Sequence, residues 1–220
     1  MFADRIDAGR QLGAHLRAFI DQECAGNEIV VLALPRGGVP VAYQIAKALG
    51  SSLDVFVVRK LGAPRQPELA MGAIASGGVR VINEEVVGAL HVTPLQLADT
   101  ADRETLELER REHAYRGDRA PIDVKGKCVL LVDDGVATGY TMRAAVAALR
   151  QQEPKRIVIA VPVAAKDTCE ELKRHADGVV CLMTPFDFAA VGQWYRHFDQ
   201  TSDDEVRLLL ERAAEPTGSC

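Results

Sequence analysis

Two adjacent carboxylates, Asp133 and Asp134, follow directly after the apolar run 129–132. At the end of a strand, such a pair can accept hydrogen bonds from sugar hydroxyls or provide oxygen ligands to a hydrated Mg²⁺. The next residues are mostly small or hydroxylated, and an alanine-rich helical segment starts at Met142. A helix N-terminus presents unpaired N–H groups that favour an anion such as phosphate. The stretch 129–143 therefore predicts a strand, an anion-binding turn and a helix.

A second turn with two glycines, Arg36-Gly37-Gly38, separates the apolar run 29–34 from a helical segment that extends to about Leu49. The glycines expose backbone N–H groups, and the arginine supplies a fork of donors for phosphate oxygens. On its own, this pattern is more often an ordinary tight turn. Together with the 129–143 stretch, it predicts a second anion site.

The ten residues 132–141, VDDGVATGYT, resemble the phosphoribosyl pyrophosphate signature of the type I phosphoribosyltransferases. The resemblance implies that Asp133 and Asp134 are catalytic: they would hold the ribose hydroxyls and a Mg²⁺ ion, directly or through water or ligand. The 5-phosphate loop would consist of Gly135, Val136, Ala137, Thr138, Gly139, Tyr140 and Thr141. The alternative interpretation is an ordinary strand–turn–helix corner in which the aspartates cap the helix.

The same resemblance assigns Arg36, Gly37 and Gly38 to the pyrophosphate, and it implies a cis peptide bond between Pro35 and Arg36. Such a bond is rare when the second residue is not proline.

Two basic residues, Arg59 and Lys60, follow a predicted strand at 53–58. Residues 61–69 contain a glycine and two prolines without periodicity, which favours a loop, and the runs 70–75 and 79–82 predict a small hairpin. This arrangement resembles the mobile catalytic flap of the type I enzymes, so Arg59, Lys60 and Arg65 are candidates to reach the pyrophosphate. The alternative is that these are solvated side chains.

The remaining elements must position these turns. Buried strands are expected at 29–34, 157–163 and 179–182 beside the central run, with helices between them at 142–149 and 167–175. Further helices are expected at 4–20, at 94–116 and after the capping sequence at Ser202. Strands that alternate with helices predict an α/β fold, a parallel sheet with helices on both faces, whose ligands lie beyond the carboxyl ends of the strands.

We interpret residues 1–220 as a single domain with a core at about 29–182. The segments 1–27 and 183–220 would form the hood that, in the resembling family, covers the site and selects the acceptor. Aromatic residues gather in 185–198, where one could stack on a base, although Trp194 is expected to pack inside the hood. Lys166, just after a strand, could meet an exocyclic oxygen of a base, but a surface role is the simpler interpretation.

Composition limits the classes of function. The chain has 220 residues, 48% of them hydrophobic and 26% charged, and a formal net charge of −5, which argues against a broad nucleic-acid-binding surface. No run is long and apolar enough for a membrane span, so a cytoplasmic protein is expected. The cysteines form no paired motif, and Cys128 and Cys181 are expected to be reduced thiols in the core.

These features predict a phosphoribosyltransferase that uses 5-phosphoribosyl 1-pyrophosphate and Mg²⁺ to transfer ribose 5-phosphate to a nitrogen acceptor, a nucleobase. One alternative is a regulator that senses the same ligand or a nucleotide without turnover. Another is phosphorolysis of, or transfer from, a different ribosyl phosphate. The resemblance also leaves open whether the protein forms a homodimer.

Overall fold

The computed structural model describes residues 1–64 and 66–215, so the expected role of Arg65 lies outside the described residues. Its centre is a five-stranded, wholly parallel sheet in the order β2-β1-β6-β7-β8. The strands span β1 Ile29–Ala33, β2 Ser52–Val55, β6 Cys128–Val132, β7 Arg156–Val163 and β8 Gly178–Met183. The predicted α/β fold with a parallel sheet is confirmed.

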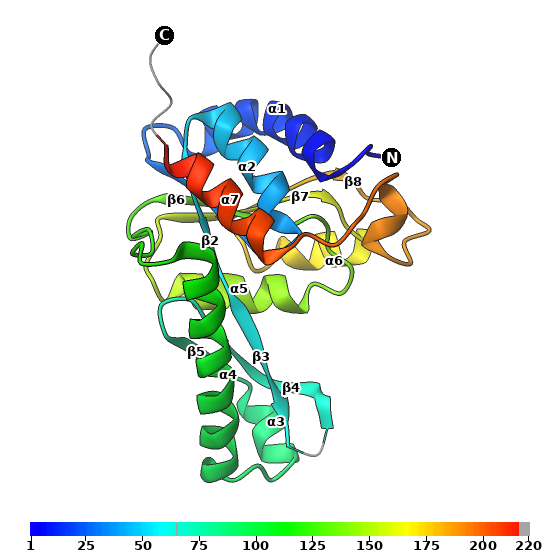
Figure 1. Ribbon diagram of the computed structural model, residues 1–220. Coiled ribbons are helices and arrows are strands. Elements are labelled where there is room, and N and C mark those ends of the chain that lie inside the picture. The colour runs from blue at the N-terminus through cyan, green and yellow to red at the C-terminus, as the bar shows by residue number, and fades with distance from the viewer. Residues whose placement is uncertain (65, 216–220) are drawn as a thin grey trace.

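Each central strand is apolar along most of its length because both faces of the sheet are covered. In β1, Val31 and Ala33 belong to the hydrophobic cluster on one face, whereas Val30 and Leu32 belong to the cluster on the other. Helices α1, α2 and α7 cover the first face, and α5 and α6 cover the second (Figure 1). The helices span α1 Arg5–Glu23, α2 Gly38–Leu49, α5 Tyr140–Arg150, α6 Lys166–Leu172 and α7 Asp203–Ala214.

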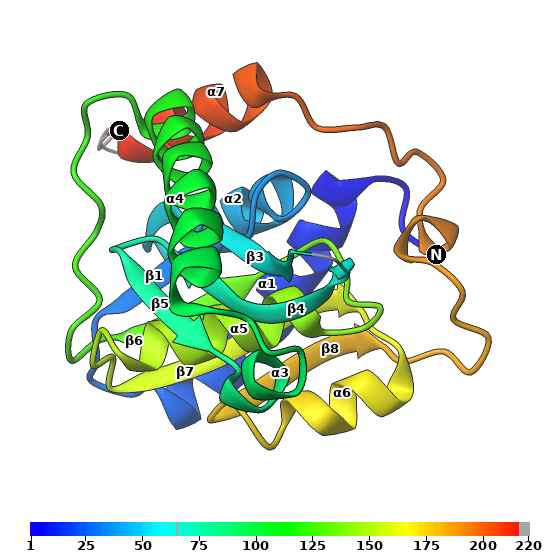
Figure 2. The same cartoon turned by 90° about the horizontal axis from the view of Figure 1, so that it is seen from below.

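An arm of mixed structure extends away from the central sheet (Figure 1). It contains an antiparallel sheet in the order β3-β4-β5, a short helix and a long helix. These elements span β3 Val58–Ala63, β4 Gln66–Ala75, β5 Val79–Ile82, α3 Glu84–Ala89 and α4 Pro94–Arg116. Seen from below, α4 crosses the layer formed by these three strands (Figure 2). The bounds of α4 and its Thr93 cap agree with the sequence.

The prediction of a loop at 61–69 is wrong, because most of these residues belong to strands. β3 continues to Ala63 and β4 begins at Gln66, so the expected two-stranded ribbon is a three-stranded sheet. The register shifts on both sides of Gly62. A β-carbon on Gly62 would lie 2.5 Å from the Pro67 carbonyl oxygen, so a glycine is required where the strands approach. Glycine and proline at this bulge hid the strand pattern.

The observed ends of other helices and strands differ from the predicted ones by a few residues. The second central strand ends at Val55 rather than at residue 58, and α6 ends at Leu172 rather than at residue 175. Helix α1 continues to Glu23. The Ser202 hydroxyl accepts a hydrogen bond from the Glu205 N–H, as expected for the cap of α7.

The prediction that Cys128 is a reduced thiol is also wrong. A disulfide joins Cys128, at the start of β6, to Cys24, at the C-terminal cap of α1. The two Cα atoms are 6.1 Å apart although 104 positions separate them in the sequence, so spacing alone could not reveal the pair. Cys181 is a free thiol, as expected, and burial raises its pKa to about 12. Within residues 1–64 and 66–215, no helix combines the length and the apolar character needed to cross a membrane.

A buried ion pair fixes the base of the arm to the central sheet. Arg116, at the end of α4, donates from Nε to Asp54 Oδ1 at 2.8 Å and from Nη2 to the Val55 carbonyl at 2.7 Å. Both charged side chains are at least nine-tenths buried. Asp54 also accepts from the Ile122 N–H, which holds the segment between α4 and β6.

Replacing Arg116 with methionine is expected to destabilise the protein by about 3–5 kcal/mol, because it leaves Asp54 buried without its partner. Urea unfolding followed by circular dichroism measures the change. The matched control is Arg110→Met on the same helix, where the exposed pair with Glu107 should contribute less than about 1 kcal/mol. Equal losses in the two variants would contradict this account of the arm.

Candidate functional site

The acid pair and the Arg36-Gly37-Gly38 turn lie side by side at the carboxyl edge of the sheet. Their strands, β1 and β6, are paired in parallel with Ala33 opposite Val132, so both turns leave the sheet at the same level. A β-carbon on Gly37 would overlap the Asp134 carboxylate, and one on Gly38 would lie 2.7 Å from the Val132 carbonyl oxygen. Only glycine permits this approach, so the packing of the two turns explains both glycines.

The peptide bond between Pro35 and Arg36 is cis, as expected from the sequence resemblance. The turn then enters α2 directly, with Gly38 N–H donating to the Leu34 carbonyl. The Arg36 side chain is partly exposed and its Nη1 lies 3.3 Å from Asp203 Oδ1, at the start of α7.

Backbone contacts with the β7–α6 connection hold the 135–141 loop. Val136 N–H donates to the Val163 carbonyl, and Ala165 N–H donates to the Val136 carbonyl. The Thr168 hydroxyl donates to the Ala137 carbonyl at 2.6 Å. The β7–α6 connection and Thr168 therefore hold one side of the loop, while four of its residues remain exposed: Ala137, Thr138, Tyr140 and Thr141.

The loop ends at the N-terminus of α5. Gly139 has a φ of +73°, and a β-carbon there would lie 2.9 Å from the Thr168 methyl group, so this position also requires glycine. The first N–H groups of a helix have no partner within the helix. The exposed start of α5 therefore has the donors and the dipole orientation that an anion needs.

Residues from both ends of the chain cover the acid pair. Arg5, the first residue of α1, donates from Nε to Asp134 Oδ2 at 2.7 Å. The Tyr195 hydroxyl donates to the Asp134 carbonyl oxygen. Arg5 was not predicted from the sequence to be a site residue, and Tyr195 was predicted only as part of the aromatic segment 185–198. No local motif could have revealed either contact, because each joins residues far apart in the chain.

Burial and mutual repulsion make the acid pair electrostatically costly. Burial raises the pKa of Asp133 well above its ordinary value, and the charge of Asp134 raises it further. Burial also raises the pKa of Asp134, whereas the charge and hydrogen bond of Arg5 oppose that rise. The pKa of Tyr195 is raised by burial and by the negative charge of Asp134, so its hydroxyl stays protonated and donates.

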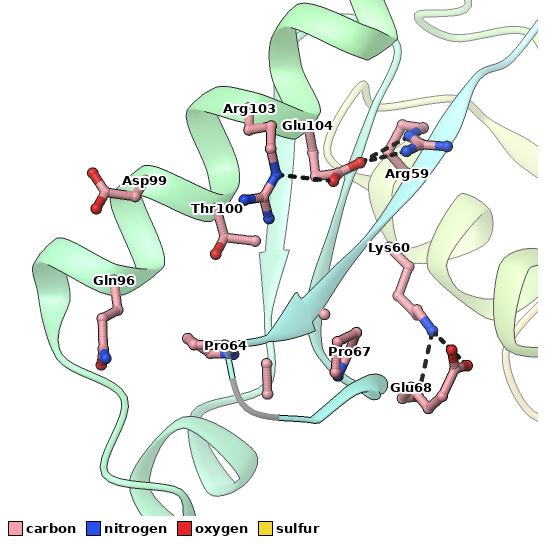
Figure 3. A pocket seen from close by; sticks show the side chains of 12 residues that line it. Arg59, Lys60, Pro64, Pro67, Glu68, Gln96, Asp99, Thr100, Arg103 and Glu104 are labelled. Carbon is pink, nitrogen blue, oxygen red and sulfur yellow. Dashed lines mark hydrogen bonds and ion pairs between the residues drawn. The ribbon is translucent and has the colours of Figure 1, made fainter.

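The two basic candidates of the arm point in different directions. Arg59 donates twice to Glu104 of α4, at 3.0 and 2.6 Å, beside a cavity of about 620 Å³ (Figure 3). Lys60 reaches Glu68 but also lines a second cavity, of about 710 Å³, together with Tyr140 and Thr141 at the start of α5. The structure thus brings Lys60, and not Arg59, to the second cavity.

Comparison with known proteins agrees with the geometry. The family model described as "Phosphoribosyl transferase domain" matches residues 3–195. The chain belongs to the phosphoribosyl transferase family.

The relatives differ in how much of their length corresponds to this chain. Two Mycobacterium tuberculosis proteins named "Putative phosphoribosyl transferase" are 48% identical over 213 residues, which is 97% of this chain but 47% of theirs. The chain therefore spans about half the length of these relatives. A "Bifunctional protein PyrR" of Chloroflexus aurantiacus is 34% identical over 142 residues, covering 62% of this chain and 72% of its own. The crystal structure of TT1426 from Thermus thermophilus has 43% identity and a TM-score of 0.85, covering 97% of this chain and 99% of its own.

The carboxylates of this phosphoribosyl transferase domain fit a Mg²⁺ ion that is held mainly by water and substrate. Residues 1–64 and 66–215 contain no cluster of three or more His, Cys, Asp or Glu side chains that could form a complete metal cage. Mg²⁺ usually binds through one or two carboxylates, several waters and substrate phosphates. Asp133 and Asp134 would supply the two carboxylates of such a donor set, and Oδ2 of Asp134 is already paired with Arg5.

The aromatic tail separates into a packed part and an exposed part. Trp194 packs against a small cluster that includes Phe2 and Tyr195, as expected for the hood. In contrast, the Phe186 side chain is 90% exposed, and Lys166 Nζ lies 5.1 Å from its ring centroid. Lys166 follows β7 and Phe186 follows β8, so both lie beyond the carboxyl edge of the sheet.

Asp133→Asn is expected to stabilise the folded protein in metal-free buffer at pH 7 by about 1–2 kcal/mol. The amide oxygen can still accept the bond from the Asp134 N–H, while the repulsion between buried charges is lost. Because the folded-state pKa of Asp133 is raised, the wild-type carboxyl weakens the fold above that pKa and has no such effect once both states are protonated. The stabilisation should therefore shrink as the pH falls through the raised pKa of folded Asp133, and it should be lost below about pH 4, where the unfolded chain is protonated as well.

Chemical denaturation of both proteins between about pH 3.5 and 8 measures this dependence. A stability difference that does not change with pH would mean that the charge of Asp133 is not its cause.

Proposed function

We propose that the protein binds 5-phosphoribosyl 1-pyrophosphate with Mg²⁺ and transfers its ribose 5-phosphate to a nitrogen atom of a nucleobase. The observation that carries this proposal is the packing of Gly37 and Gly38 against the acid pair Asp133 and Asp134. A ligand with an anion at each end and hydroxyls between them matches this order of groups: two anion-binding turns on either side of two carboxylates.

Each turn takes one part of this ligand. The exposed loop 137–141 and the N-terminus of α5 bind the 5-phosphate. Asp133 and Asp134 accept hydrogen bonds from the ribose hydroxyls. Arg36 and the 37–38 backbone bind the pyrophosphate, for which Arg36 must exchange its partly exposed pair with Asp203. We assign the approach to the bound phosphates to Lys60 of the arm, because it lines the same cavity as Tyr140 and Thr141.

In the transfer, the bond from ribose C1 to the pyrophosphate oxygen breaks as a bond from C1 to the acceptor nitrogen forms. The electron pair of the broken bond leaves with pyrophosphate, and the proton of the acceptor nitrogen passes to water. In the transition state the ribose ring carries positive charge, which the two neighbouring carboxylates stabilise. When bound, Mg²⁺ would neutralise negative charge on the pyrophosphate oxygens.

The surroundings of Phe186 support a flat acceptor. Its exposed ring offers a face on which a base could stack, and stacking on aromatic rings does not require a particular base. Lys166, next to that ring, can donate to an exocyclic oxygen of the base. We therefore assign the acceptor to bases that carry a ring carbonyl.

The second candidate function is sensing of the same ligand without turnover. The pairing of Arg59 with Glu104 favours it, because this arginine is not available to the leaving pyrophosphate in the described conformation. The two candidates share the binding site and differ only in turnover.

Incubation of the protein with Mg²⁺, phosphoribosyl pyrophosphate and a panel of nucleobases separates these candidates. Transfer predicts release of pyrophosphate that depends on one or a few bases with a ring carbonyl. Phe186→Ala should raise the KM for that base at least about 5-fold, since one stacked base contributes about 1–3 kcal/mol, and it should leave the KM for phosphoribosyl pyrophosphate unchanged. Binding of phosphoribosyl pyrophosphate without release for any base would reject transfer and support sensing.

The assignment of the phosphate loop predicts a ligand-specific effect of Thr138→Val. The loss of one hydroxyl donor to a charged phosphate should weaken both phosphoribosyl pyrophosphate and ribose 5-phosphate about 10- to 150-fold. Pyrophosphate should bind this variant as it binds the wild type, whereas Arg36→Ala should weaken it. Titration calorimetry measures the three affinities, and Thr105→Val, on α4, is the control substitution.

If Thr138→Val weakened pyrophosphate as much as ribose 5-phosphate, the two anion sites would be misassigned.

A further inference from the structure

Arg5 is held in place by three different contacts. Its Nε donates to Asp134 Oδ2 at 2.7 Å, and its Nη1 donates to the Asp199 carbonyl at 2.6 Å. Its guanidinium lies over the Phe198 ring, with 3.9 Å between Cζ and the ring centroid. Phe198 in turn packs on Tyr195. A long side chain with three such contacts has few alternative conformations, so Arg5 is fixed before any ligand binds.

The pair between Arg5 and Asp134 differs from the surface ion pairs of this protein. The two side chains are only 12% and 13% exposed, whereas the Lys125–Glu153 pair is 70% and 67% exposed. Exposed pairs contribute little because water competes for each partner. The orientation of a carboxylate that is withdrawn from water instead depends on its partner, because few water molecules compete for it.

The contacts also decide which oxygen of Asp134 is engaged. Arg5 takes Oδ2, the oxygen that also lies against Gly37 in the pyrophosphate turn. The Tyr195 hydroxyl holds the backbone carbonyl of the same residue. Asp134 is thus fixed through its side chain and its main chain, and the hydrogen bonds found among residues 1–64 and 66–215 do not include one to its Oδ1.

We propose that Arg5 is a positioning residue of the ribose site, which holds the Asp134 carboxylate turned so that Oδ1 receives a ribose hydroxyl. The inference rests on the proposed function, because it presumes that ribose binds at the acid pair. It extends that function by giving the hood a part in binding the phosphoribosyl donor as well as the acceptor. The residues that complete the donor site then come from both ends of the chain, Arg5 from one and Tyr195 with Phe198 from the other.

The test compares Arg5→Gln and Arg5→Lys with the matched control Arg10→Gln, an exposed arginine on the same helix. Titration calorimetry measures the affinity of each protein for Mg²⁺–phosphoribosyl pyrophosphate and for pyrophosphate with Mg²⁺. We expect Arg5→Gln to weaken phosphoribosyl pyrophosphate at least about 10-fold, as the loss of a charged hydrogen-bond partner should.

The other measurements separate positioning from a general effect. Arg5→Gln should change pyrophosphate affinity less than about 2-fold, since the contacts of Arg5 are made with the acid pair and the hood rather than with Arg36. Arg5→Lys should recover part of the loss, and Arg10→Gln should match the wild type.

A milder variant protects the test against a folding defect. Phe198→Leu keeps Arg5 but removes the ring beneath its guanidinium, and it should weaken phosphoribosyl pyrophosphate in the same selective way, by a smaller factor. Thermal unfolding confirms that each variant is folded.

Four outcomes would overturn the inference. If Arg5→Gln bound phosphoribosyl pyrophosphate as the wild type does, Arg5 would have no role in binding. If it bound more tightly, Arg5 would compete with the ligand for Asp134. The variant could weaken both ligands equally, which would make the role of Arg5 purely structural. Finally, a wild-type protein that binds no phosphoribosyl pyrophosphate would reject the proposed function, and this inference with it. That last result is read from the wild type alone, so the two failures are distinguishable.

Discussion

The contact between the Gly37-Gly38 turn and the acid pair is the constraint on which the rest of the site depends. It exists because β1 and β6 are adjacent parallel strands whose ends are level, with Ala33 opposite Val132. No side chain larger than hydrogen fits at either glycine. Neighbouring turns of a parallel sheet can therefore act on the two ends of one small ligand, while the buried strands hold the distance between them.

This arrangement places two carboxylates next to each other where water is largely excluded. Burial raises the pKa of both, repulsion adds to the rise at Asp133, and a fold that contains them must compensate for the cost. Compensation comes from outside the central sheet, through the charge and hydrogen bond of Arg5, while the Tyr195 hydroxyl holds the main-chain carbonyl of Asp134. The hood is thus part of the electrostatics of the site, in addition to covering it. Functional sites commonly retain such costly groups because the chemistry needs them.

The elements that were predicted well from the sequence are those that depend on residues close together in the chain. The segment 129–143 contains a strand, a turn and a helix start within one continuous stretch, so its fold could be derived from pattern and composition. The partners that were missed are far apart in the chain: Arg5 lies 129 positions from Asp134, and Cys24 lies 104 from Cys128. Strand β3 and residues 66–69 of β4 were missed for another reason, because a glycine bulge and prolines hide the alternation of the strands.

The central claim is that one ligand spans both turns, with its ribose on the carboxylates. The most direct measurement is a crystal structure of the protein with Mg²⁺ and phosphoribosyl pyrophosphate. The account predicts the 5-phosphate on the backbone of 137–141, the ribose hydroxyls on Asp133 and Asp134, and the pyrophosphate on Arg36 and the 37–38 amides. A ligand bound elsewhere, for example in the cavity between the arm and α5, or with its two anionic ends exchanged, would contradict it.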